Sequence, residues 1–422
     1  MNDAYEEIRR RAVALVEERG IDVTSDREAA HRVVGGAVDE YQQRAHLGRG
    51  RALADPGAMV ERVMRSVADF GPLTELLARP DLEEVFIEGS RVSYIDAGGR
   101  LRALDQPTSE RENRQVLDRL LADSDRRLDA SSPMVQARVL DDSARLTAVI
   151  PPVADRLSAT LRRYALRRET LDTMVERSAL SSTAARFMWA AMQATTSIVV
   201  SGPPGAGKTS LLSALIGAVP AGHCVRCCEE VRELHVPLVH GSFYESRPPS
   251  LDGKGEISLR HLVKLVLAMR PDRIVVGEVR GAEAFELTRA VNAGCGFACT
   301  VHANSAADAL DALVNAALMA GENVTEGVVR KVFSSALDFV IHLDRDAVGD
   351  GPIRRRVTEI LAVVPSVRDD FSTQPIFRRE HIGAPLEWTG ALPPQPLVDR
   401  IERALPDSER LRSLLGAREV VA

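Results

Sequence analysis

One stretch restricts the possible folds of this chain more than any other: SIVVSGPPGAGKTSLLSALIG, residues 197–217. The phosphate-binding pattern G-x4-G-K-[ST] is filled here by Gly202, Gly207, Lys208 and Thr209. An apolar, β-branched run precedes the pattern and an apolar, helix-forming run follows it, which is the strand–loop–helix context in which the pattern binds phosphate. The stretch therefore predicts a P-loop nucleotide site on a parallel α/β sheet.

Each residue type in this loop has a physical role in holding a nucleoside triphosphate. Glycines let backbone N–H groups wrap phosphate oxygens, and the helix N-terminus adds a positive dipole. Lys208 is expected to reach the β- and γ-phosphates, and the Thr209 hydroxyl to bind Mg²⁺. We predict ATP and Mg²⁺ as cofactors, because the chain has no N-K-x-D motif of a GTPase. The predicted binding segment is Gly202, Pro203, Pro204, Gly205, Ala206, Gly207, Lys208, Thr209 and Ser210.

A P-loop site also needs a carboxylate at a neighbouring strand end, for Mg²⁺ or for the attacking water. The apolar run RIVV is followed by Gly277 and Glu278, so Glu278 is the one carboxylate at that strand end. A second acid must come from elsewhere, and another strand-like run ends in Glu229 and Glu230. Acidic residues at strand ends also occur in solvated turns. Their presence in one sheet with a P-loop favours a catalytic role for both.

Hydrophobic periodicity divides the chain of 422 residues into four predicted segments. Residues 1–65 form a helical N-terminal segment, and residues 66–168 mix helix and alternating strands in an α+β N-terminal domain. Strands and helices alternate through residues 169–365, as in a RecA-like P-loop ATPase domain with a parallel sheet. Residues 366–422 form a Pro-rich C-terminal tail that ends in a charged amphipathic stretch. The predicted fold class is therefore α/β.

Charge and hydropathy limit the partners and the compartment. The net charge of −6 and the 4% aromatic content disfavour the basic, stacking surface of a nucleic-acid motor. A helicase-like or conjugative motor stimulated by nucleic acid is the alternative on the same core. The N-terminus is acidic and amphipathic, unlike a signal peptide. Arg186 and Gln193 interrupt the most apolar window, so we expect no transmembrane segment and a cytosolic protein.

The cysteines raise a different hypothesis, a metal site. The two short stretches that contain all five have the spacings C-x2-C and C-x3-C-x2-H, and the cysteines are Cys224, Cys227, Cys228, Cys295 and Cys299. Structural zinc needs four converging ligands, whereas the adjacent Cys227 and Cys228 on a strand must point to opposite faces. We therefore expect reduced thiols that act mainly as small buried apolar residues.

The order of the motifs resembles a known family. GPPGAGKT, EEVREL, ESRPPSLDGKGE, LAMRPDRIVVGEVRG and TVHANS follow one another as in the type II/IV secretion-system ATPase superfamily, most closely its CpaF-like branch. That branch serves Tad/Flp pili and type IV secretion. The likeness spans roughly residues 60–365.

The resemblance implies roles for the acids and for one histidine. Glu229 and Glu230 match the family's acidic box near Mg²⁺ and water, and Glu278 matches its Walker B glutamate, before which the family also tolerates glycine. His302 matches the second histidine of the His box, which senses the γ-phosphate. Two departures stand out, since Glu230 replaces the usual Asp and Cys295 lies near the place of the first histidine.

The resemblance also implies an assembly and partners. Arg138, Arg145 and Arg162 fall on basic positions of the N-terminal domain, some of which act on nucleotide across a domain or subunit boundary. A guanidinium there can stabilise charge on the transferring phosphoryl group. The implied protein is a cytoplasmic homohexameric ATPase at the inner face of the membrane. It would bind an inner-membrane platform protein and power Tad/Flp-type pilus assembly or type IV secretion-like export.

Overall fold

The computed structural model of the protein divides into two compact units, residues 1–165 and 166–422. Each unit is described by itself. The described residues are 2–21, 23, 26–79, 81–96, 99–122, 124, 126–141, 143–163, 169–234, 238–247, 249, 253–321, 323–346, 353–365, 370–406 and 410–416. The motif ESRPPSLDGKGE includes positions 248 and 250–252, which lie outside this set.

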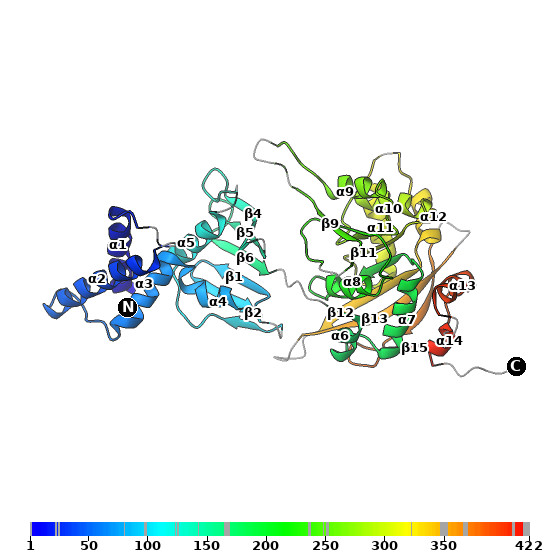
Figure 1. Ribbon diagram of the computed structural model, residues 1–422, viewed down its shortest axis with the longest axis horizontal. Helices are drawn as coiled ribbons and strands as arrows, with labels where there is room; N and C mark the ends of the chain where they lie inside the picture. Colours follow the sequence, from blue (N-terminus) through cyan, green and yellow to red (C-terminus); the bar gives the residue numbers. More distant parts are fainter. Residues whose placement is uncertain are drawn as a thin grey trace. The chain divides into compact units, whose positions relative to one another are not determined.

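The first unit begins with a small helical bundle of α1 (Asn2–Glu18), α2 (Arg27–His46) and α3 (Pro56–Ala68) (Figure 1). The helices bury a common apolar core in which Ile8, Val34 and Val63 are fully covered. The side chains of Asp26 and Asp55 accept backbone N–H groups at the starts of α2 and α3, as helix N-caps do. The helical segment predicted from periodicity is therefore present.

An antiparallel sheet completes the first unit. Its order is β3-β2-β1-β6-β5-β4. The short helices are η1 (Gly71–Leu73), α4 (Thr74–Ala78) and α5 (Glu110–Leu121), and the strands are β1 (Glu84–Glu88), β2 (Arg91–Ile95), β3 (Leu101–Ala103), β4 (Met134–Val139), β5 (Ala144–Val149) and β6 (Ser158–Arg163). Alternate residues such as Val85 and Ile87 share a core with Leu76 of α4 and Leu117 of α5. One face of the sheet therefore packs on helices.

The second unit is built on a larger mixed sheet with the order β15-β14-β13-β12-β7-β11-β10-β8-β9. From β12 to β9 neighbouring strands are parallel, and β13 to β15 add antiparallel strands. The strands are β7 (Ile198–Ser201), β8 (Val225–Glu229), β9 (Gly241–Glu245), β10 (Arg273–Val276), β11 (Gly296–Val301), β12 (Phe339–Asp346), β13 (Arg354–Val364), β14 (Ser372–Arg378) and β15 (Glu387–Trp388). The parallel α/β core predicted from the P-loop context is confirmed.

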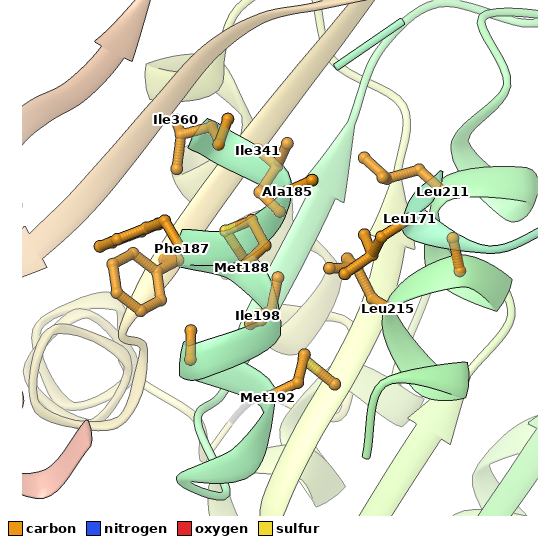
Figure 2. Close-up of a cluster of buried hydrophobic side chains, with 14 of the residues drawn as sticks. Leu171, Ala185, Phe187, Met188, Met192, Ile198, Leu211, Leu215, Ile341 and Ile360 are labelled. Atoms are coloured by element: carbon orange, nitrogen blue, oxygen red, sulfur yellow. The ribbon is translucent and has the colours of Figure 1, made fainter. Parts of the chain in front are cut away.

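Helices cover both faces of this sheet. The core on one face contains α6 (Leu171–Glu176), α7 (Ser182–Gln193), α8 (Lys208–Gly217), α13 (Gln395–Ala404) and α14 (Leu411–Leu414). The core on the other face contains α9 (Leu259–Leu267), α10 (Glu283–Asn292), α11 (Ala306–Leu318) and α12 (Glu326–Ala336). Figure 2 shows the first core, where Phe187 and Met188 of α7 lie beside Ile198 of β7. The P-loop strand is thus fixed from both sides.

Residues beyond 365 belong to this packing. Strand β14 pairs with β13, and Ile401 of α13 is fully buried in the core beside α7. Arg400 of α13 forms an ion pair with Asp338, whose other carboxylate oxygen accepts the Ser197 backbone N–H at 2.7 Å. The predicted segments 169–365 and 366–422 therefore share one compact unit. The tail helps to hold the strand that leads into the P-loop.

Candidate nucleotide-binding site

The phosphate loop lies between the end of β7 and the start of α8. Gly202 has φ of +153°, and a Cβ atom there would lie 2.3 Å from the backbone oxygen of Leu343, so a larger residue cannot occupy the position without moving the loop. Gly207 forms the N-cap of α8 in a left-handed conformation. Thr209 and Ser210 follow in the first turn and are half-buried. The open N-terminus of α8 and its backbone N–H groups form an anion-binding cradle.

Three predicted residues from three separate motifs meet beside this loop. The Lys208 Nζ donates to the carbonyl oxygens of Gly202 and Pro203 at 3.0 and 3.1 Å. It also lies 3.1 Å from Nδ1 of His302, whose Nε2 lies 2.6 Å from Oε1 of Glu278. A hydrogen bond from Lys208 to His302 and a close contact between His302 and Glu278 therefore connect the loop lysine to the strand-end glutamate. The parallel strands β7, β10 and β11 produce this meeting because their carboxyl ends share one edge of the sheet.

The partners of His302 fix its tautomer. The ammonium group of Lys208 can only donate, so Nδ1 must accept, and the ring proton is on Nε2, the nitrogen that lies 2.6 Å from Glu278 Oε1. Partial burial and the positive charge of Lys208 lower the pKa of His302. The imidazole is therefore neutral at pH 7, and it can pass a change at Lys208 to Glu278.

Sequence reasoning missed Arg280, although it lies two residues after Glu278 in EVRG. The guanidinium donates from Nε and Nη2 to the two oxygens of Glu278, both at 2.8 Å, and from Nη1 to Glu230 at 3.3 Å. These bonds to Glu278 raise the pKa of Arg280. A bidentate pair fixes carboxylate orientation as well as charge. The structure thus brings Glu278 and Glu230 together through a shared arginine.

Glu229 is placed differently from Glu230. It is only 2% exposed, and its Oε1 accepts the backbone N–H groups of Glu233 and Leu234 at 3.0 Å each. Burial raises the pKa of Glu229 to about 7. A Cβ atom on Gly277 would lie 2.8 Å from Cγ of Glu229. The missing aspartate before Glu278 therefore has a steric reason, since the Glu229 side chain fills the space beside residue 277.

The predicted arginines lie in the first unit in a single row. Arg138, Arg145 and Arg162 occupy directly opposed positions on β4, β5 and β6, so their side chains share one face of the sheet. Glu84 of β1 continues the row and lies 3.8 Å from Nε of Arg162. Like charges in directly opposed positions destabilise a sheet. The row is a candidate anion-binding surface, and its action on the nucleotide stays a prediction.

Three of the five cysteines lie in strands, Cys227 and Cys228 in β8 and Cys299 in β11, while Cys224 and Cys295 directly precede these strands. All five are free thiols, and Cys227 and Cys228 lie in the cores on opposite faces of the sheet. Cys295 and Cys299 are buried beside Phe297, and burial raises the pKa of Cys295 to about 11. Within the described ranges, no three or more His, Cys, Asp and Glu side chains are placed to hold a metal ion.

Comparisons with known proteins identify the family of this chain. A family model described as type II/IV secretion system protein matches residues 67–351. A provisionally named conjugal transfer protein of Mycobacterium tuberculosis, Rv3659c, is 33% identical over 299 residues, which cover 69% of this chain and 83% of that protein. Type IV secretion system protein PtlH of Bordetella pertussis is 32% identical over 271 residues, which cover 56% and 76%.

A solved structure is similar in fold. The ATPase DotB of Yersinia pseudotuberculosis has a TM-score of 0.50 and 18% identity, and the match covers 69% of this chain and 77% of that one. Among the described helices, none combines the length and the hydropathy needed to cross a bilayer. The phosphate loop with its lysine, histidine and glutamate, in a chain that the family model matches over more than half of its length, indicates an ATPase. The chain belongs to the type II/IV secretion system protein family.

Proposed function

We propose that this chain is a ring-forming motor that hydrolyses ATP with Mg²⁺ and drives Tad/Flp-type pilus assembly or type IV secretion-like export. It would work in the cytoplasm against an inner-membrane platform protein. Family membership supports the export role, and the order of motifs supports the Tad/Flp branch. The proposed subunits form a homohexamer.

The observation that carries the proposal is the series of side-chain contacts from Lys208 through His302 to Glu278. A phosphate oxygen is a stronger acceptor for Lys208 than the neutral carbonyl groups that it now contacts. Nucleotide would therefore draw Lys208 away from Gly202 and Pro203 and change its contact with His302. His302 would pass this change to Glu278, which then orients the attacking water. The position of the Glu278 carboxylate would thereby depend on whether a γ-phosphate is bound.

The residues at this edge of the sheet fit a magnesium ion. Mg²⁺ is usually held by one or two carboxylates together with substrate phosphates. The Thr209 hydroxyl, Glu278 and the Oε2 atom of Glu229 are the oxygen donors offered, and that Oε2 atom is buried without a hydrogen-bond partner among the described residues. The ion would neutralise phosphate charge. Glu230, which accepts a hydrogen bond from Arg280, would add its carboxylate to the same acidic site.

In the proposed ring, the arginine row would act on the nucleotide. Arg138, Arg145 and Arg162 would contact the nucleotide from the first unit of the same or a neighbouring subunit and stabilise phosphoryl charge. Binding can then drive movement only if ATP prefers one arrangement of the units to another. Native mass measurement with a non-hydrolysable ATP analogue tests the assembly. A hexamer is expected, and a monomer at all protein concentrations would contradict it.

Complementation tests the biological role. In the source organism, deletion of the gene is expected to abolish surface pili or export, wild type is expected to restore them, and Lys208→Ala is expected not to. Restoration by Lys208→Ala would refute the motor, because the phosphate loop would then be dispensable.

Conjugation is a second candidate, favoured by the conjugal transfer names of two relatives, Rv3659c and TrbB of Rhizobium radiobacter. An ATPase assay with single-stranded DNA distinguishes conjugation from pilus assembly or protein export. ATPase activity stimulated many-fold by such DNA would support a nucleic-acid motor, and unchanged activity would support pilus assembly or protein export.

A further inference from the structure

Strand β12 runs on beyond the end of its neighbour β7. The last pair between these parallel strands is His342 with Ser201, while β12 extends to Asp346. A β-bulge follows His342, and the backbone oxygen of the next residue, Leu343, lies where a Cβ of Gly202 would be. On the side where β7 has ended, the final residues of β12 therefore run alongside the phosphate loop, while β13 pairs with them on the other side.

Two arginines from this extension reach the loop. Arg345 of β12 and Arg355 of β13 are direct cross-strand partners, so both side chains lie on one face of the hairpin. Nη1 of Arg345 lies 2.8 Å from the position of a Cβ on Gly205, and Cδ of Arg355 lies 3.8 Å from that of a Cβ on Gly207. One guanidinium and one arginine stem thus contact two glycines of the cradle.

The two arginines add positive charge beside the loop. Like charges in directly opposed strand positions repel, and the N-terminus of α8 adds positive potential. Of the described residues, none forms an ion pair with Arg345, and its flanking acids Asp344 and Asp346 alternate to the other face of the strand. An anion bound at the loop would be stabilised by this positive charge.

The strand order shows which part of a nucleotide these arginines face. Strand β7 is flanked by β11, which carries His302, on one side and by β12 on the other. Glu278 follows β10, beyond β11. His302 and Glu278, which are proposed to respond to the γ-phosphate, therefore approach the loop from one flank. Arg345 and Arg355 approach it from the other.

The geometry points to Arg345 and Arg355 as a second phosphate clamp that holds the α- and β-phosphates, the groups that ATP and ADP share. The inference deepens the proposed function and rests on its nucleotide site. Guanidinium groups suit this task because they are always charged and can give two parallel hydrogen bonds to a phosphate. Since ADP keeps both phosphates, the clamp also retains the product after hydrolysis.

Binding measurements on the full chain test the clamp. Fluorescent ADP and a fluorescent, non-hydrolysable ATP analogue are titrated into wild type, Arg345→Ala, Arg355→Ala and Arg345→Lys. Loss of a hydrogen bond to a charged group predicts about tenfold weaker binding of both ligands in each alanine variant. The ratio of the two affinities should stay as in wild type, and Arg345→Lys should fall between wild type and Arg345→Ala.

Arg354→Ala is the matched control, because it removes the same charge from the same strand at an exposed position on the opposite face. It should change both affinities less than twofold. The clamp is overturned if Arg345→Ala and Arg355→Ala, with unchanged thermal unfolding, bind ADP within twofold of wild type, or if they weaken the ATP analogue alone. Failure of wild type to bind either ligand would instead refute the proposed function itself.

Discussion

Gly277→Asp would restore the acid that many P-loop proteins carry before the strand-end glutamate, yet we expect it to damage this protein. A Cβ atom at residue 277 would lie 2.8 Å from Cγ and 3.2 Å from Oε1 of Glu229. Crowding of this kind in a packed interior typically costs about 1–3 kcal/mol, which Gly277→Ala measures alone. The aspartate adds a like charge beside Glu229. Two such charges about 4 Å apart repel by about 4 kcal/mol at an effective dielectric constant near 20.

Chemical unfolding at pH 8, where Glu229 is mostly ionised, separates these contributions. Gly277→Asp is expected to lower the free energy of unfolding by more than Gly277→Ala. Glu229→Ala removes both the crowding group and the like charge, so the same Gly277→Asp change in that background should cost about 5–7 kcal/mol less than in wild type. Equal costs in the two backgrounds, or a Gly277→Asp variant as stable as wild type, would refute the steric explanation of the missing aspartate.

Three further predictions test the site. Gly202→Ala should weaken ATP binding by about tenfold or more, because its Cβ would meet the Leu343 carbonyl oxygen at 2.3 Å; equilibrium titration checks this, and binding within twofold of wild type would contradict it. The pKa of Glu229 rises from 4.5 to about 7 on folding, so the folded state holds its proton more tightly and about 3 kcal/mol of stability should be lost as pH rises through this window. Glu229→Gln should lack that loss when unfolding is compared at pH 5 and pH 8, and an identical loss in both proteins would refute the assignment. Arg280→Gln should lower kcat about tenfold with KM within twofold, since Arg280 orients Glu278 through two 2.8 Å bonds without contacting the loop; steady-state kinetics with a raised KM and normal kcat would argue against that role.

Much of the site follows from the sequence because a parallel sheet collects strand ends at one edge. The motifs placed Lys208 and Glu278 at separate strand ends, and the family resemblance added His302. In the structure Lys208 is hydrogen-bonded to His302, whose Nε2 lies 2.6 Å from Glu278. The alternation of side chains along a strand likewise separated Cys227 from Cys228. These features depend only on strand direction and period, which local sequence determines.

Other features depend on which strands pair and how their side chains fill space. The positions of Glu229 beside Gly277 and of Arg345 beside Gly205 are examples. They follow from strand register and a bulge, which no local sequence pattern reveals. Strand β14 was hidden by Pro375, since proline removes a ladder donor and argues against a strand. Here Pro375 pairs with Leu361 at a register irregularity near the edge of the sheet, where the missing N–H is tolerated.

Phosphate release from ATP tests the central claim most directly. Purified wild-type protein with Mg²⁺ is expected to hydrolyse ATP, and Lys208→Ala and Glu278→Gln are expected to lose turnover while each remains folded by thermal unfolding. Lys208→Ala removes the side chain that contacts the loop and His302, and Glu278→Gln removes the negative charge that His302 and Arg280 face. Normal turnover in both variants would contradict the claim that Lys208, His302 and Glu278 form the hydrolytic site.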